Sequence, residues 1–305
     1  MNKLSFEGRV AVVTGAGRGI GRAHALLLAG RGARVVVNDL GGSMQGVGAD
    51  AEPASAVVGE IVAAGGVAIA DNSDVATPAG GQALVDAAVE RFGRVDIVIN
   101  NAGIIRWAGF PEADADNLEN HLAVHVGGSF NTTRAAWPQM LEQGYGRIVM
   151  TGSAGMFGLP ENLSYATAKA AVIGLTRSLK TAGAAHDIKV NVIAPAAMTR
   201  MAGRPKDGVD PQMSPDLVAP MVAFLAHEDC PVSGEIYAAG AGRFARIFIA
   251  STAGYVHPDP EPTVEDVARN WATINDETDY YVPADLTDWS RVFMTHLFPG
   301  PGSAR

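Results

Sequence analysis

The segment Thr14-Gly15-Ala16-Gly17-Arg18-Gly19-Ile20-Gly21 decides the fold, because it joins a strand-like run to a helix-like one. The run before it, Val10–Thr14, is rich in Val, and the Ala- and Leu-rich segment 20–31 follows it directly. Glycines allow the backbone to turn tightly here and let a pyrophosphate approach the N-terminus of the helix. A side chain at Gly15 or Gly21 would occupy that space. The order strand, glycine turn, helix therefore predicts a dinucleotide-binding site.

The same alternation of Val- and Ile-rich runs with helix-length segments continues through the first 240 residues. Such βα alternation is typical of an α/β fold, and the handedness of the connections makes the sheet parallel. We therefore expect a single Rossmann-type, doubly wound parallel sheet with helices on both faces. The expected strands are Val10–Thr14, Ala33–Asn38, Val67–Ala70, Asp96–Asn100, Gly146–Thr151, Lys189–Ile193 and Glu235–Ala238, and the expected helices span 20–31, 54–64, 79–92, 114–142, 162–184 and 215–227.

Residues 1–243 are expected to form this catalytic domain, and residues 244–305 a C-terminal extension packed on the body or on a partner subunit. Residues 197–214 contain several Pro and Gly and little periodicity, which is typical of a lid or binding loop. In the extension, Thr263 and Asp266 resemble a capping box, so a helix is expected over about 264–275.

Composition excludes several classes of protein. The net charge of −9 disfavours nucleic acid as a partner, since phosphate backbones need a basic surface. Cys230 is the single cysteine, so no internal disulfide can form, which fits a reducing compartment. No apolar run has the length of a signal peptide or membrane span. We expect a cytoplasmic protein with a small-molecule substrate, no membrane partner and no metal site.

An acidic residue closes the second expected strand. Asp39 lies near the spacing at which a carboxylate accepts the ribose hydroxyls of NAD, and it would repel the 2′-phosphate of NADP. Arg18 is close enough in the glycine turn to receive that phosphate, so NADP stays open beside NAD. Asp74 can bond the adenine amino group. In Asn101-Ala102-Gly103, the amide can tie neighbouring strand ends while the glycine lets the cofactor pass.

Three further residues form a candidate catalytic group. Tyr165 and Lys169 lie four residues apart in a strongly helical segment and therefore share one face. A lysine ammonium and a positive nicotinamide ring both favour the phenolate, so Tyr165 can take a proton from an alcohol. Ser153 follows the fifth strand, where its hydroxyl can orient the substrate oxygen. Lys169 can also hold the nicotinamide ribose.

These motifs, with Asn191-Val192-Ile193-Ala194-Pro195, resemble the short-chain dehydrogenases/reductases in order over residues 6–240. The resemblance implies the roles given above, Thr199 beside the nicotinamide carboxamide, and a homodimer or homotetramer that often packs through the tyrosine helix. Its small residues Ala168, Ala171 and Gly174 suit such contact. The cofactor-binding residues implied are Gly15, Gly17, Arg18, Gly19, Ile20, Gly21, Asp39, Asp74, Val75, Asn101, Ala102, Gly103, Tyr165, Lys169, Pro195 and Thr199.

Two positions depart from the family pattern. His125 stands where many members carry a fourth catalytic residue, asparagine, and Ala196 follows Pro195 where many carry glycine. The resemblance implies that this asparagine distorts the helix and that its backbone carbonyl helps to hold a water beside the catalytic lysine. We expect His125 to preserve this helix distortion and to use its ring for a hydrogen bond. A buried core histidine is the other interpretation.

A narrower resemblance concerns the substrate. The stretches Val35–Gly42, Gly127–Phe130, Thr133–Trp137 and Gly240–Gly242 are similar to the (3R)-hydroxyacyl-CoA dehydrogenase part of peroxisomal D-bifunctional proteins, whose relatives act on hydroxysteroids. An apolar substrate pocket is expected from Ile104, Ile105, Trp107, Met156, Phe157, Leu159 and Met198. In the lid, Arg200, Arg204 and Lys206 either meet the phosphates of coenzyme A or are solvated charges.

The sequence thus predicts an NAD-dependent oxidoreductase that interconverts a secondary alcohol and a ketone, on a 3-hydroxyacyl-CoA or hydroxysteroid-type substrate. Two alternatives remain. Sugar-nucleotide epimerases and dehydratases share the Tyr-x-x-x-Lys pattern but usually have a larger substrate domain. A non-catalytic NAD-binding sensor would be expected to lack Tyr165 or Lys169, and both are present.

Overall fold

The computed structural model describes residues 3–202 and 210–297. The chain divides into two compact units, residues 1–246 and 247–305. The expected lid at 197–214 is described only at its two ends, and Arg204 and Lys206 lie outside the described residues. Everything that bears on the candidate site belongs to the first unit.

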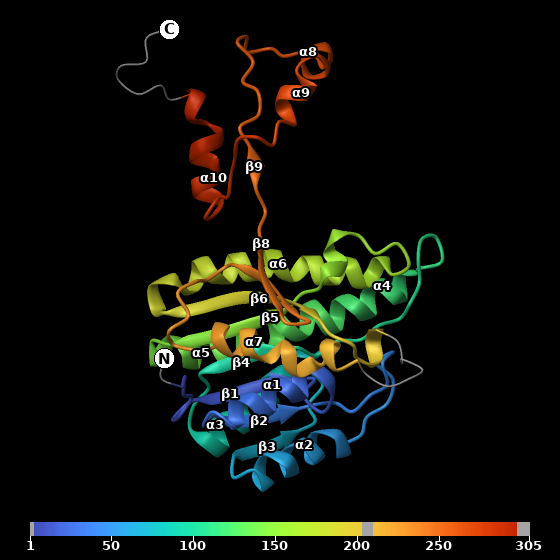
Figure 1. The fold of residues 1–305 in the computed structure, drawn as a ribbon, viewed down its shortest axis with the longest axis vertical. Helices are drawn as coiled ribbons and strands as arrows, with labels where there is room; N and C mark the ends of the chain where they lie inside the picture. Colours follow the sequence, from blue (N-terminus) through green and yellow to red (C-terminus); the bar gives the residue numbers. More distant parts are fainter. Residues whose placement is uncertain (1–2, 203–209, 298–305) are drawn as a thin grey trace. The chain divides into compact units, whose positions relative to one another are not determined.

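The first unit is built on an eight-stranded sheet in the order β3-β2-β1-β4-β5-β6-β7-β8, as Figure 1 shows. Pairing is parallel from β3 through to β7, which confirms the doubly wound parallel sheet expected from the sequence. A two-residue turn, Ala241-Gly242, joins β7 to β8, and a turn this short joins only antiparallel strands. The strands are β1 (Val10–Thr14), β2 (Arg34–Asn38), β3 (Val67–Asp71), β4 (Ile97–Asn100), β5 (Gly146–Thr151), β6 (Ile188–Ala196), β7 (Ile236–Gly240) and β8 (Arg243–Ile247).

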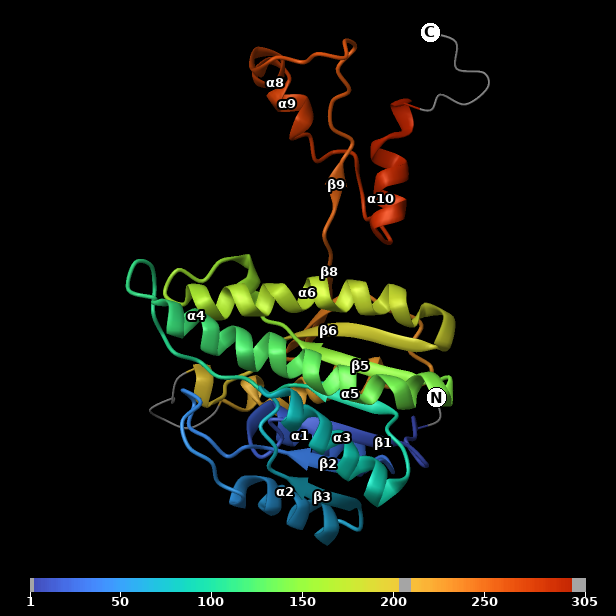
Figure 2. The same ribbon diagram turned by 180° about the vertical axis from the view of Figure 1, so that it is seen from behind.

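Helices cover both faces of this sheet. On one face α1 packs against α2 and α7, and on the other α5 packs against α3 and α4 against α6. In Figure 1, α1 and α7 lie in front of the sheet. In Figure 2, which is the view from the other side, α3 and α5 lie in front of it. Strand β1 is buried along its whole length because both faces are covered. The helices are α1 (Gly19–Ala29), α2 (Glu52–Ala63), α3 (Pro78–Phe92), α4 (Ala115–His121), α5 (Gly128–Gln143), α6 (Leu163–Gly183) and α7 (Ala219–Leu225).

The helix expected over 114–142 is not continuous. Between α4 and α5 the backbone widens into a π-helical segment, η1 (Leu122–Gly127), in which Gly128 donates to the carbonyl of Ala123. Short π-helical segments are often found at functional sites. His125 lies inside η1, so the helix distortion expected at this residue is present.

The second unit contains two short antiparallel strands, β9 (Ser251–Thr252) and β10 (Tyr280–Tyr281), with α8 (Val264–Arg269), α9 (Trp271–Ile274) and α10 (Leu286–Phe293). The capping box of Thr263 and Asp266 is formed, but the helix expected at 264–275 is interrupted at Asn270. Among the described residues, no helix combines the length and apolar character needed to cross a membrane.

Candidate active site

The glycine turn after β1 leaves the start of α1 open to a ligand. Gly15 and Gly19 have φ angles of +61° and +53°, which a side chain would strain. Arg18 precedes α1 in extended conformation and gives it no side-chain cap, so its first backbone N–H groups lack a side-chain acceptor. Arg18, Gly19 and Ile20 line a cleft beside this turn. These features fit the phosphates of a dinucleotide.

Two of the glycines, Gly15 and Gly21, allow neighbouring backbone segments to pack closely. A side chain on Gly21 would collide with the carbonyl of Gly15, and one on Gly15 would lie 2.8 Å from Cα of Ala102. Both positions therefore permit close packing of backbone on backbone, and Gly15 also lines the cleft beside the turn. A side chain at Gly17 would meet the carboxylate of Asp39 at 2.7 Å.

Asp39 is held at the end of β2 by two backbone donors. Its Oδ2 accepts from the N–H of Gly17 at 2.8 Å, and its Oδ1 accepts from the N–H of Gly41 at 2.7 Å. Each carboxylate oxygen keeps a second lone pair for another donor. Because Asp39 also lines the cleft, a ribose diol can use those lone pairs.

The strand ends opposite Asp39 are tied together as the sequence predicted. The Asn101 amide Nδ2 donates to the carbonyls of Thr14 at 3.0 Å and Gly15 at 3.1 Å. The Thr14 hydroxyl accepts from the backbone N–H groups of Asn101 and Ala102, both at 3.0 Å. These bonds fix the loop after β4 against the glycine turn.

Together these groups border a cleft of about 330 Å³, a volume in the ordinary range for ligand sites. Neither Tyr165 nor Lys169 is among the residues that line it, and Gly17, Gly21 and Pro195 are also absent from its lining. The predicted cofactor residues that line it are Gly15, Arg18, Gly19, Ile20, Asp39, Asp74, Val75, Asn101, Ala102, Gly103 and Thr199.

The three candidate catalytic side chains come together beside α6. Ser153 and Tyr165 are neighbours, since a side chain added at Gly155 would lie 3.3 Å from Oγ of Ser153 and 3.6 Å from Cε1 of Tyr165. The ammonium of Lys169 lies 5.7 Å from the centre of the Tyr165 ring and donates to the carbonyl of Thr151 at 2.7 Å. Asn162 caps α6 by accepting from the N–H of Tyr165, which fixes where the helix and its tyrosine begin.

Burial controls the proton affinities of these groups. It raises the pKa of the Tyr165 hydroxyl, against the opposing effect of Ser153. It also lowers the pKa of Lys169 to about 7. Desolvation thus penalises the charged form of both side chains.

His125 packs against the tyrosine with a second histidine that the sequence analysis did not assign. The His125 and His121 rings stack at 5.9 Å, and both meet the Tyr165 ring edge-on, at 5.4 and 6.3 Å. Burial lowers the pKa of both histidines, that of His125 well below its ordinary value, so both rings are neutral near pH 7. Their four-residue spacing was the only sequence signal for this pair.

The His125 ring serves as a hydrogen-bonding group. Nε2 lies 2.9 Å from the carbonyl and 3.3 Å from the N–H of Ile104, and the shorter contact assigns the proton to Nε2, while Nδ1 is buried without a partner. The His125 carbonyl accepts from the Ser129 hydroxyl at 2.7 Å. The Ser129 hydroxyl therefore occupies one lone pair of the carbonyl that was expected to hold a water. The second lone pair of that carbonyl stays available.

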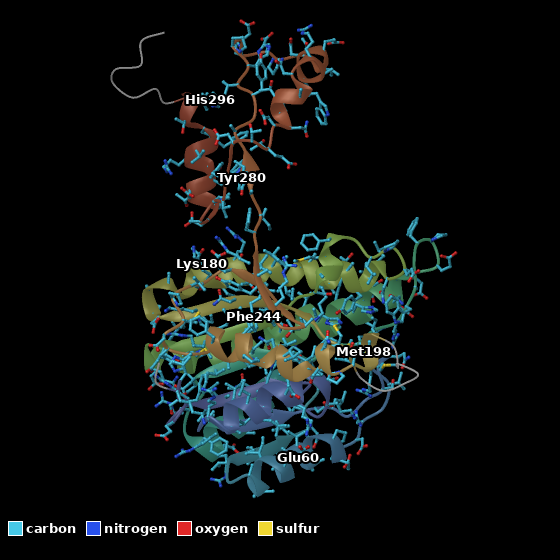
Figure 3. All side chains as sticks on the ribbon, in the orientation of Figure 1. Glu60, Lys180, Met198, Phe244, Tyr280 and His296 are labelled. Atoms are coloured by element: carbon cyan, nitrogen blue, oxygen red, sulfur yellow. The ribbon has the colours of Figure 1, made fainter. Side chains whose placement is uncertain are left out.

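The predicted substrate residues are less closely grouped. Ile105 is buried, whereas Trp107 and Phe157 are 55% and 74% exposed. Leu159 lies near Tyr165, since a side chain added at Gly155 would touch both residues. Met198, labelled in Figure 3, follows β6 at the carboxyl edge of the sheet and is half-buried.

Known proteins share both this sequence and this fold. The family described as short chain dehydrogenase matches residues 9–207. A short-chain type dehydrogenase/reductase of Mycobacterium tuberculosis is 42% identical over 275 residues, which cover 88% of this chain and 95% of the relative.

Two solved structures extend the comparison. Peroxisomal multifunctional enzyme type 2 of Drosophila melanogaster matches with a TM-score of 0.79 and 33% identity, over 96% of this chain and 50% of that one. The chain thus spans about half the length of this relative. A 7α-hydroxysteroid dehydrogenase, solved with NADH and 7-oxo glycochenodeoxycholic acid, matches with a TM-score of 0.70 and 30% identity, over 79% of this chain and 98% of that one.

Proposed function

The chain belongs to the short chain dehydrogenase family, and from this we propose that it is an NAD-dependent dehydrogenase for a secondary alcohol. The observation that carries the proposal is the grouping of the Ser153 hydroxyl, the Tyr165 ring and the Lys169 ammonium, which lies 5.7 Å from the centre of that ring. This arrangement places a proton donor and acceptor next to a group that can hold a substrate oxygen.

In this reaction each side chain has a separate task. Ser153 orients the oxygen of the alcohol or ketone, and Tyr165 takes its proton during oxidation or returns it during reduction. The nicotinamide cofactor supplies the hydride acceptor or donor and, when oxidised, a positive charge. That charge favours the Tyr165 phenolate and so opposes the burial that raises its pKa. Lys169, anchored on Thr151, adds positive charge when protonated.

For the substrate, we propose a 3-hydroxyacyl-CoA or a hydroxysteroid-type alcohol. The Drosophila relative is a peroxisomal multifunctional enzyme, and the structural neighbour is a hydroxysteroid dehydrogenase. Apolar side chains at Trp107, Phe157 and Leu159 suit a bulky apolar substrate. Arg200, at the described end of the lid, remains a candidate for the phosphates of coenzyme A.

The decisive experiment is NADH formation from a panel of (3R)- and (3S)-hydroxyacyl-CoA thioesters, hydroxysteroids and simple secondary alcohols. The proposal expects turnover with one of the first two classes and little with simple alcohols. Tightly held NAD with no net NADH formation would point instead to epimerase or dehydratase chemistry. NAD binding without turnover of any compound would indicate a sensor.

We further propose a cytoplasmic homodimer or homotetramer that packs through α6. Ala171 and Gly174 are exposed on this helix, and a side chain added at Gly174 would meet nothing within 4 Å, so a second helix can approach closely. Ala168 is buried within the chain and does not contribute.

Asp39→Ala is expected to remove most of a preference for NAD over NADP. Hydrogen bonds to a charged carboxylate contribute about 1.5–3 kcal/mol each, so two to the ribose favour NAD by at least about tenfold. The measurement is kcat/KM with each cofactor. Asp39→Asn keeps an acceptor for Gly17 or Gly41 and separates loss of charge from disorder of the loop. Equal use of NADP by the parent enzyme would contradict the assignment.

His125→Asn is expected to retain kcat within about tenfold, with an unchanged pH profile. The asparagine amide can replace Nε2–H as donor to Ile104, and the neutral ring has no proton to lose near pH 6.5. His125→Leu, which cannot donate, should be more strongly impaired. The test is kcat between pH 5.5 and 9. A limb near pH 6.5 in the parent that vanishes in the variant, with a hundredfold fall in kcat, would make the histidine a proton carrier.

A further inference from the structure

The connection between β2 and α2 is an ordered loop, residues 41–50, that borders the cofactor cleft. Its two ends are closed by the bond from the N–H of Asp50 to the carbonyl of Leu40, at 2.9 Å. At the tip, the Ser43 hydroxyl accepts from the N–H groups of Gln45 at 3.3 Å and Val47 at 3.2 Å. The 41–50 loop therefore has a defined conformation of its own.

The tip of the 41–50 loop is bonded to the segment that follows the cofactor strand β4. The N–H of Ile105 donates to the carbonyl of Met44, and Nε of Arg106 donates to the carbonyl of Gln45, both at 2.8 Å. Gly46 lies so close that a side chain there would be 2.9 Å from Cγ2 of Ile104. Three successive residues, 104–106, thus contact the loop.

The histidine pair bonds two of these three residues, Ile104 and Arg106. His125 Nε2 bonds the carbonyl of Ile104, and His121 Nε2 accepts from the N–H of Arg106 at 3.2 Å. His121 has a fixed tautomer, because its Nδ1 bonds the carbonyl of Asn117 at 2.7 Å. The segment is therefore clamped between the 41–50 loop and the rings that pack on Tyr165.

We propose that the 41–50 loop is a positioning element for the substrate. Its tip sets the place of Ile104, Ile105 and Arg106, and through them that of Trp107. The next residue, Ala108, forms a β-bridge with Asn162, which caps α6 at Tyr165. The loop begins at Gly41, whose N–H donates to the Asp39 carboxylate. The 41–50 loop therefore contacts both Asp39, the expected acceptor for the ribose, and the segment 104–106. This inference rests on the proposed dehydrogenase function and identifies residues that fix substrate affinity without touching the reacting atoms.

Two glycines of the loop give a matched test. Gly46 and Gly48 have nearly equal φ angles, +80° and +84°, so alanine strains the backbone similarly at both. A side chain at Gly48 meets nothing within 4 Å, whereas one at Gly46 meets Ile104. Ile104 is buried and β-branched, so its side chain cannot rotate away cheaply. Gly46→Ala must therefore displace the segment 104–106, whereas Gly48→Ala leaves this segment in place.

Gly46→Ala is expected to raise KM for the substrate roughly tenfold or more with a smaller change in kcat, because misplacement of about 1 Å has effects of this order. The dissociation constant for NADH, from fluorescence titration, should rise by a smaller factor than KM, although Gly46 also lines the cofactor cleft. Without cofactor or substrate, hydrogen exchange at the amide of Ile105 should accelerate at least tenfold in Gly46→Ala. Gly48→Ala should match the parent in all three measurements.

Equal behaviour of the two variants in exchange and KM would overturn the positioning role. So would a tenfold loss of NADH affinity in Gly46→Ala with unchanged substrate KM, because the loop would then serve the cofactor alone. Failure of the proposed function is recognised separately. In that case the parent itself shows no turnover, while the exchange measurement still reports whether the loop holds Ile105.

Discussion

Replacing Tyr165 with phenylalanine is expected to lower kcat by about 10³-fold, since positioned general acid–base groups contribute on this scale. The phenyl ring keeps its edge-on contacts with His121 and His125, so packing around α6 is preserved. Only the hydroxyl, whose pKa is lowered by Ser153, is removed. The dissociation constant for NADH should remain within about threefold of the parent value, because the cleft near Asp39 is untouched.

The control for this variant is Tyr145→Phe. Tyr145 is also buried, and burial raises its pKa as well, but it lies before β5 at the opposite edge of the sheet. A phenyl ring there can still receive Arg9, whose guanidinium lies 3.8 Å from the ring centre. Tyr145→Phe should therefore keep kcat. Turnover by Tyr165→Phe within tenfold of the parent would remove the tyrosine from the mechanism.

The second large effect concerns stability. Arg147→Met is expected to lower the free energy of unfolding by about 2–4 kcal/mol, because it removes a buried guanidinium that donates to several carbonyls, and a buried acceptor that loses its donor costs about 1–3 kcal/mol. The Arg147 side chain is 1% exposed, and its guanidinium pairs with Asp187 Oδ2 at 3.1 Å. It also donates to the backbone carbonyls of Gly146, Asp187, His227 and Glu228. Methionine fills similar volume but removes the guanidinium donors, although the carbonyls of Asp187 and His227 keep the backbone N–H groups of Gly146 and Cys230 as donors.

Urea unfolding followed by circular dichroism measures this loss, provided that the transition has one step. Arg22→Met is the matched control, because Arg22 forms an ion pair with Glu60 in which both side chains are about 40% exposed. Exposed pairs contribute about 0–1 kcal/mol, so the control should unfold almost like the parent. A loss below 1 kcal/mol for Arg147→Met would mean that water satisfies these carbonyls.

Local pattern was enough to predict the fold. The buried runs of Val and Ile mark strands β1 to β7 within a few residues, and the glycine turn fixes where β1 meets α1. The π-helical segment at Leu122–Gly127 is different, because its residues have the spacing of an ordinary helix. The extra backbone residue is favoured by contacts of His121 and His125 with the segment 104–106, and helical periodicity does not report such contacts.

The residues of the candidate site likewise fall into those that local sequence pattern predicts and those that it does not. Ser153, Tyr165 and Lys169 lie close together in the sequence, and helix geometry places the last two on one face. The structure brings all three together. The 41–50 loop and Arg147 were missed because their partners are distant in sequence. The bond between Met44 and Ile105 joins residues 61 positions apart, and no local pattern marks either member.

The bonds between Thr14 and Asn101 also determine when the site can be assembled. These residues are 87 positions apart, because β1 lies beside β4 in the sheet. Ribosomes add about 5–20 residues per second, so β1 and the glycine turn are exposed for roughly 4 to 17 s before Asn101 is made. The dinucleotide half of the site is thus encoded first but completed late. During synthesis Val10–Thr14 can pair with β2 early, but its β4 side stays an open apolar edge that must be kept from aggregating.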